Sequence, residues 1–95
     1  MKQMTNRALL QHQVDSGLRL DHDPGTCGTC ACRQLFGAVA AEMLREIEAG
    51  EPDLAEWTAR IDARWRDSKF VKLWAEEQAA GRDPRAAFAA RGWEP

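Results

Sequence analysis

Residues 33–53 read RQLFGAVAAEMLREIEAGEPD, and this stretch decides the fold class. Its apolar side chains recur at spacings of three and four residues, which line one wide face of an α-helix. The residues on that face are Leu35, Phe36, Val39, Ala40, Met43, Leu44 and Ile47. Gly50 suits the left-handed conformation that ends a helix, and Pro52 prevents the helix from resuming. The stretch therefore predicts an amphipathic helix from about Arg33 to Ala49.

Further helices are predicted on both sides of this stretch. Before it, Thr5 or Asn6 can cap a helix that ends near Asp15. After it, Asp53 can cap a helix whose apolar residues share one face, namely Leu54, Trp57, Ile61 and Trp65. No part of the sequence alternates apolar and polar residues over about four to eight positions, as a half-buried strand would. The sequence thus predicts helices and no sheet.

A fourth helix is predicted after residue 67. Asp67 or Ser68 can cap it, and Gly81 can end it. The side chains that it would turn inward are Phe70, Leu73 and Trp74.

The last predicted helix has clear boundaries. Asp83 is a good N-cap, and Pro84 suits the first helical position because its missing N–H is not needed there. Gly92 suits the position just after the helix, which makes Phe88 and Trp93 the pair that touch in a Schellman motif. We therefore expect one all-α domain over residues 1–95, built from four to five short helices.

Length, charge and composition exclude several classes of protein. A chain of 95 residues holds about one small domain. Its net charge of −2 and isoelectric point near 5.6 argue against general binding to nucleic acids or anionic membranes. No apolar run approaches the ~20 residues that cross a bilayer, and no signal-peptide core follows Met1. We expect a cytoplasmic protein with no membrane role.

The chemistry-bearing part of the sequence is the loop 21–32, between the first two predicted helices. Its three cysteines follow a histidine in the pattern His22-x4-Cys27-x2-Cys30-x-Cys32. Three thiolates and one imidazole form a standard tetrahedral set for structural Zn²⁺. A structural metal also supplies folding free energy to a chain with a small core. The pattern therefore predicts a zinc-binding loop that is held by these four residues.

Two questions about this loop stay open. His12, on the first predicted helix, is an alternative fourth ligand, and Asp21, Asp23 or a second chain are others. The cysteines also suit thiol redox chemistry, because the positive end of a helix dipole favours thiolate over thiol. In a third interpretation they are inert thiols that behave as small apolar side chains.

Aromatic residues on the third and fourth predicted helices indicate an interaction surface. These residues are Trp57, Ile61, Trp65, Phe70 and Trp74, and we expect them to bind a partner protein or a second copy of the chain. Basic residues lie beside them: Arg60, Arg64, Arg66, Lys69 and Lys72. A nucleic-acid interface on this face is possible but disfavoured, because acidic residues are interleaved with the basic ones.

The sequence contains no recognisable catalytic constellation. It has no Ser/His/Asp arrangement, no Walker-type phosphate loop and no dinucleotide fingerprint. Glu42, Glu46 and Glu56 are interpreted as solvated helix residues rather than as paired acid and base carboxylates. We therefore expect a protein that is not an enzyme.

The sequence as a whole predicts a zinc-stabilised helical protein that acts by binding another macromolecule, first of all a protein. A regulatory or adaptor role in bacterial or phage biology fits its size. One alternative is a thiol-based redox sensor or oxidoreductase that uses Cys27, Cys30 and Cys32. The other is a nucleic-acid-binding module that uses the Arg/Trp face of the third and fourth helices.

Overall fold

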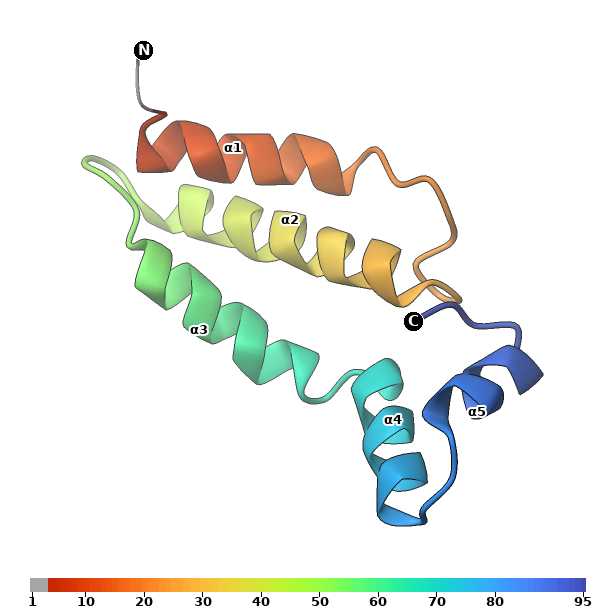
Figure 1. The fold of residues 1–95 in the computed structure, drawn as a ribbon. Coiled ribbons are helices and arrows are strands. Elements are labelled where there is room, and N and C mark those ends of the chain that lie inside the picture. The colour runs from red at the N-terminus through yellow and green to blue at the C-terminus, as the bar shows by residue number, and fades with distance from the viewer. Residues whose placement is uncertain (1–3) are drawn as a thin grey trace.

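The computed structural model describes residues 4–95, and every regular element in that range is a helix (Figure 1). The helices are α1 (Asn6–Gly17), α2 (Gly28–Glu46), α3 (Leu54–Trp65), α4 (Lys69–Ala79) and α5 (Pro84–Ala90). Outside them, Cys27 and Glu94 form an isolated parallel β-bridge. The expected fold class, a small all-α protein of four to five helices, is confirmed.

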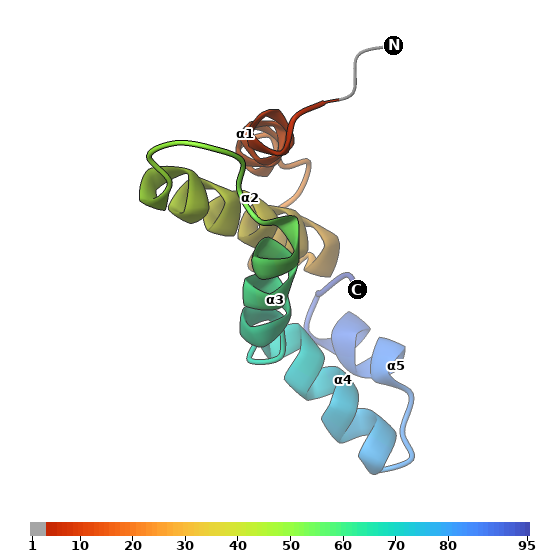
Figure 2. The ribbon, with the colours of Figure 1, turned by 90° about the vertical axis from the view of Figure 1, so that its left-hand side faces the viewer.

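Helix α2 lies at the centre of one end of the molecule. It runs back alongside α1, and α3 packs on its other side (Figures 1 and 2). Helices α1 and α2 approach closely where two glycines face each other. A Cβ atom on Gly37 would lie 2.8 Å from the carbonyl oxygen of Gln13 and 3.2 Å from the Cα atom of Gly17. Glycine is therefore required at position 37 for this close packing.

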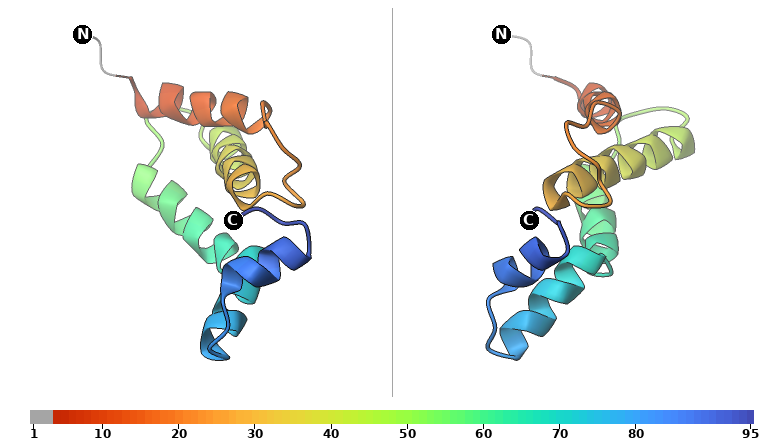
Figure 3. Two further views of the ribbon diagram at one scale, coloured as in Figure 1. Left: turned by 45° about the vertical axis from the view of Figure 1, so that its right-hand side comes forward. Right: turned by 90° about the vertical axis from the view of Figure 1, so that its right-hand side faces the viewer.

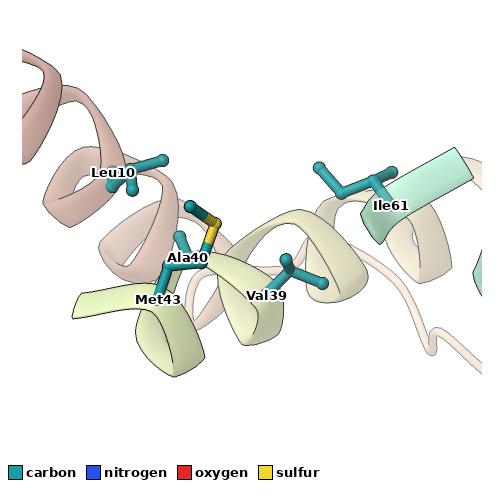
Figure 4. Packing of buried hydrophobic residues seen from close by; sticks show 5 residues of the cluster. All are labelled: Leu10, Val39, Ala40, Met43 and Ile61. Atoms are coloured by element: carbon teal, nitrogen blue, oxygen red, sulfur yellow. The ribbon is translucent and has the colours of Figure 1, made fainter. Parts of the chain in front are cut away.

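Two apolar clusters stabilise the fold. The first joins α1, α2 and α3 and contains Leu10, Val39, Ala40, Met43 and Ile61 (Figure 4). Its α2 members belong to the apolar face that the sequence predicts. The second cluster joins α4 and α5 through Phe70, Leu73 and Phe88, with Trp65, Trp74 and Trp93 packed against it. Each fully buried large side chain contributes about 1.5–3 kcal/mol to folding.

The start of α2 differs from the prediction. The helix begins at Gly28 rather than at Arg33, because the thiol of Cys27 acts as the N-cap and accepts a 3.5 Å hydrogen bond from the N–H of Cys30. The expected loop 21–32 is therefore shorter, and Cys30 and Cys32 lie on the helix. At its other end α2 stops at Glu46 rather than at Ala49, since Ile47 is already extended.

The other helix boundaries follow the predicted capping residues. Thr5, Asp53, Ser68 and Asp83 each accept a backbone N–H hydrogen bond at the start of a helix. α1 extends to Gly17, slightly beyond the predicted Asp15. Gly81 and Gly92 have φ values of 72° and 70°, the left-handed conformation that was expected of both.

The Schellman motif at the end of α5 is confirmed. The N–H of Trp93 donates to the carbonyl of Phe88 at 2.9 Å, and the N–H of Gly92 donates to that of Ala89 at 3.1 Å. The rings of Phe88 and Trp93 meet edge to face with centroids 5.8 Å apart. This motif directs residues 93–95, called the tail below, back toward the start of α2 (Figure 3).

The molecule is elongated. Its extents are 48 × 26 × 25 Å and its radius of gyration is 15.8 Å. A compact domain of this length would have a radius of gyration of about 12 Å. Helices α4 and α5 project from the α1–α3 end, so part of their surface is left without a covering layer (Figures 2 and 3).

Candidate metal centre

The loop between α1 and α2 is folded by hydrogen bonds to Asp23. The carbonyl of Asp23 accepts the N–H groups of Thr26 at 3.0 Å and Cys27 at 2.9 Å, and its carboxylate accepts that of Gly25 at 2.9 Å. Asp side chains favour such turns because they can replace a backbone acceptor. The turn places His22, which precedes it, beside the cysteines that follow it.

Three of the predicted ligands come together. The ligand atoms of His22, Cys27 and Cys30 all lie within 4.8 Å of one another, and the Sγ atom of Cys30 is 4.0 Å from Nδ1 of His22. In a tetrahedral zinc site such atoms are about 3.5–3.8 Å apart, so small side-chain rotations would bring these three to suitable separations and leave the fourth position to another ligand. Cys27 and Cys30 are buried and His22 is exposed. These three residues could hold a metal ion.

The structure does not bring Cys32 into this group. Residues two positions apart on an α-helix differ by about 200° in direction, so Cys32 and Cys30 point to opposite sides of α2. Cys32 instead lines an apolar pocket, where burial raises the pKa of its thiol. The prediction of Cys32 as a ligand assumed that it lay in a loop, and the early start of α2 removes that assumption.

His12 also lies outside the group. It is exposed on α1, and the imidazole that lies close to the two thiols is that of His22. Within residues 4–95, the ligand set is thus two thiols and one imidazole.

The tail is attached to the same loop by contacts that the sequence does not predict. The N–H of Glu94 donates to the carbonyl of Thr26, and the N–H of Gly28 donates to the carbonyl of Glu94, both at 2.7 Å. A Cβ atom on Gly28 would lie 2.9 Å from the carbonyl carbon of Pro95, so this contact requires glycine. Gly28 within the Cys-x2-Cys motif was the available signal for a close backbone approach.

Helix α4 is attached to the loop through Lys69. Its ammonium group donates a hydrogen bond to the carbonyl of Gly25. The same group lies 4.5 Å from the ring centroid of Trp93, a cation–π distance. The loop, the tail and the first turn of α4 therefore form one connected unit around Cys27.

An apolar pocket of about 540 Å³ adjoins this unit. It lies between the start of α2, the end of α3, and helices α4 and α5. Its walls include Cys32, Trp65, Phe70, Val71, Trp74 and Phe88, with Gly28 and Pro95 at its edge. The pocket and the candidate metal centre thus share Gly28 as a neighbour.

The predicted interaction residues divide into two groups. Ile61 and Phe70 are core residues that are only 6% and 5% exposed. Trp57 is half-buried in the first cluster, where its indole N–H donates to the carbonyl of Phe36 at 3.2 Å. Trp65 and Trp74 are half-buried in the second cluster and reach the pocket wall. Of the five predicted interaction residues, Trp65, Phe70 and Trp74 line the pocket that a partner could occupy, whereas Trp57 and Ile61 do not.

Two members of the basic run, Arg60 and Arg64, are paired with acids. Arg60 forms ion pairs with Glu42, Glu46 and Glu56, and Arg64 forms one with Glu42. The three glutamates are solvent-accessible, as the sequence predicts, and the structure adds that they pair with these arginines in a surface network. Hydrogen bonds from Arg64 and then Arg60 lower the pKa of Glu42. Since these arginines are neutralised, the face offers less positive charge than its sequence indicates.

Among residues 4–95, none of the helices combines the length and the apolar character needed to cross a bilayer. No protein family, no characterised protein and no solved structure shows significant similarity to this chain.

Proposed function

We propose that the protein is a non-enzymatic binding module in which Zn²⁺, held by His22, Cys27 and Cys30, stabilises an apolar pocket that receives a partner protein. Two thiolates and an imidazole are ligands that suit zinc, and clustered buried thiols suit it better than Mg²⁺ or Ca²⁺. The ion is structural in this proposal because it would join the loop to the first turn of α2. Folding and metal binding would then be coupled.

One observation carries the proposal: a candidate metal ligand, Cys27, is directly followed in the chain by a residue of the pocket wall, Gly28. Cys27 is bridged to Glu94, and the next residue, Gly28, borders the pocket together with Pro95. An ion bound to Cys27 would fix the loop to which the tail is attached. The tail forms part of the pocket wall, so metal binding would favour the conformation in which the pocket is formed.

The chemistry of the pocket favours a protein partner. Its walls consist mainly of carbon atoms from Trp65, Val71, Trp74 and Phe88. Half-buried tryptophans are the residues that most often dominate binding energy at protein interfaces. A pocket of about 540 Å³ accepts one or two large apolar side chains. The proposed role is therefore to capture an apolar anchor of another protein, as a regulator or adaptor does.

Two measurements test this function. Titration of the apoprotein with Co²⁺ and Zn²⁺ should give one metal per chain, with the charge-transfer absorption of Co²⁺ bound to thiolates. A photo-crosslinking amino acid at Val71, on the pocket wall, should give a discrete protein adduct in the native cells. The matched control is the same amino acid at Ala63, which is exposed on α3 and outside the pocket. Absence of metal binding, or equal crosslinking at both positions, would contradict the proposal.

A second candidate function is a thiol redox switch. Cys27 and Cys30 have their sulfur atoms within 4.8 Å, and the Cys27 thiol accepts the N–H of Cys30 at the start of α2. In the metal-free protein, a peroxide would take two electrons and two protons from the two thiols. A disulfide forms, and the peroxide is reduced to an alcohol and water. Mass spectrometry of the peroxide-treated, metal-free protein should show a mass lower by two hydrogen atoms. This decrease, and its absence in Cys27→Ser, would support the redox candidate.

A further inference from the structure

The candidate metal centre supplies three of the four ligands that Zn²⁺ usually takes. Among residues 4–95, the ligand atoms that lie together are those of His22, Cys27 and Cys30. A purely structural zinc site takes all four ligands from the protein, whereas a site that also binds a ligand from outside takes three and keeps one position open. The donor set of this chain is of the second kind.

The two carboxylates that flank His22 in the sequence are engaged elsewhere. The carboxylate of Asp23 accepts the N–H of Gly25 at 2.9 Å within its own turn. The carboxylate of Asp21 lies 3.5 Å from the guanidinium of Arg33 in an ion pair. Neither carboxylate belongs to the cluster of ligand atoms. A tetrahedral site therefore needs a ligand in addition to those that residues 4–95 bring together.

The site lies where a ligand from solution can reach it. Cys27 and Cys30 are only 4% and 2% exposed, whereas His22 is exposed. An ion that binds all three would lie between two buried thiolates and an exposed imidazole, at the boundary between protein and solvent. A small ligand would reach such an ion without any rearrangement of the helices.

The metal centre and the apolar pocket lie on different sides of α2. Cys30 belongs to the cluster of ligand atoms and Cys32 to the pocket wall, and the two residues point to opposite sides of the helix. An apolar anchor that fills the pocket therefore does not face the ion. This separation favours a small molecule, bound independently of the pocket's partner, as the ligand that completes the metal centre.

Charge and softness select the kind of small molecule. Two thiolates cancel the charge of Zn²⁺, and a neutral imidazole adds none. The loop carries additional positive charge, because Lys69 donates to the carbonyl of Gly25 and forms no ion pair within residues 4–95. The first turn of α2 contains no acid that would offset the helix dipole. Both features favour an anion, and a thiolate is the anion that best matches a metal ion with two sulfur ligands.

We propose that Zn²⁺ in this protein binds a low-molecular-weight thiol as its fourth ligand, and that Lys69 supplies charge that favours the thiolate. The S–H bond of the thiol breaks, its proton passes to solvent, and the sulfur keeps the electron pair that it donates to the metal. Nothing is oxidised or reduced. This inference rests on the proposed function because it requires the metal site, and it adds a ligand that the pocket does not bind.

Absorption spectroscopy of the Co²⁺-loaded full chain tests the proposal. Anaerobic titration with 2-mercaptoethanol should increase the sulfur-to-Co²⁺ charge-transfer absorption, shift the d–d bands and saturate at one thiol per ion. Ethylene glycol is the same molecule with oxygen in place of sulfur, and it should leave the spectrum unchanged. Acetate, an anion without sulfur, should bind at least about tenfold more weakly than the thiol.

Variants of Lys69 test the charge. Lys69→Gln removes the charge but keeps a hydrogen-bond donor for the carbonyl of Gly25, so the thiol should bind roughly two- to fivefold more weakly. Lys69→Arg should retain the wild-type affinity. Arg45→Gln removes a positive charge from an exposed position at the other end of α2, and it should leave the affinity unchanged.

The outcomes separate this inference from the proposed function. If one Co²⁺ binds per chain but 2-mercaptoethanol leaves its spectrum unchanged or removes the ion from the protein, the inference is overturned and the metal site stands. Binding of acetate as tight as that of the thiol also overturns it, and equal affinity in Lys69→Gln overturns the role of Lys69. If no Co²⁺ binds, the inference and the proposed function both fail. A saturable response that requires the sulfur atom supports the inference, whatever crosslinking at the pocket shows.

Discussion

The carbonyl oxygen of Glu94 accepts a 2.7 Å hydrogen bond from the N–H of Gly28, so the tail is fixed at the first turn of α2. Gly28 directly follows Cys27, which caps that helix and belongs to the candidate metal centre. A site formed by residues 22–30 is therefore coupled to α5, although α5 is distant in sequence. This coupling makes the metal centre relevant to the pocket as well as to the loop.

Cys30→Ser and Cys32→Ser should differ sharply in metal binding. Cys30 is within the cluster of ligand atoms, whereas Cys32 points to the other side of α2. Loss of one of three protein ligands should reduce Co²⁺ affinity by at least about tenfold. At a Co²⁺ concentration that saturates the wild type, we expect Cys30→Ser to lose much of the thiolate-to-Co²⁺ absorption and Cys32→Ser to retain it. A strong loss in Cys32→Ser would contradict the ligand set.

Removal of the metal should lower the stability of the wild type. A ligand that binds only the folded state raises the melting temperature, so a strong chelator should lower it in the metal-loaded protein. The Cys30→Ser variant provides the matched control, because chelation should leave its melting curve unchanged. Identical melting curves of the wild type with and without chelator would exclude a stabilising role for the ion.

Gly37→Ala should destabilise the protein although alanine is the better helix former. The added Cβ atom would lie 2.8 Å from the backbone oxygen of Gln13, which cannot move without shifting α1. Such overpacking costs about 1–3 kcal/mol of unfolding free energy, more than the roughly 1 kcal/mol gained in helix propensity. Urea unfolding measures this difference. Gln34→Ala, an exposed substitution on the same helix, should change stability by less than about 0.5 kcal/mol.

The helix boundaries could be predicted where they depend on local chemistry. Ser68 and Asp83 cap helices because their own side chains accept the nearby N–H groups. Gly92 ends α5 because glycine adopts positive φ at little cost. The start of α2 was missed because a cysteine thiol takes the capping role that Ser, Thr, Asp or Asn usually has. The prediction of Cys32 as a ligand rested on the same assumption of a longer loop, and Cys32 lies outside the cluster.

Features that join distant parts of the chain could not be predicted. Nothing local to Glu94 indicates that its backbone pairs with Thr26 and Gly28. The network of Arg60 with Glu42 likewise depends on how α3 packs on α2. The meeting of His22, Cys27 and Cys30 could be predicted, because only a short turn separates them and their approach requires little tertiary structure.

Glu42→Gln should reduce stability at neutral pH and lose this effect in acid. Hydrogen bonds from Arg64 and Arg60 hold the pKa of the Glu42 carboxyl below its ordinary value of 4.5. The carboxylate therefore stabilises the folded state above pH 4.5, and this stabilisation is lost as the pH falls through the lowered pKa. Urea midpoints of wild type and variant should differ at pH 7 and converge in acid. Glu48→Gln, at an exposed position without an ion pair in residues 4–95, should show neither behaviour.

Zinc binding should slow amide hydrogen exchange where the tail meets the loop. The hydrogen bonds of the Gly28 and Glu94 N–H groups flank Cys27, so both amides exchange only when the loop and the tail separate. An ion bound to Cys27 and His22 would make that separation less favourable. When free Zn²⁺ is about ten times its Kd, exchange at both amides should slow roughly tenfold.

The control for this effect is the N–H of Gly81, which bonds to the carbonyl of Gln78 at the end of α4, outside the loop and the tail. Its exchange reports local opening of a helix end and should respond little to zinc. Cys30→Ser should abolish the slowing at Gly28 and Glu94 while leaving Gly81 unchanged. If zinc slows all three amides equally, it acts on global stability alone, and the coupling between metal centre and tail is refuted. If it slows Gly28 and Glu94 selectively, the ion controls the backbone that forms one wall of the pocket.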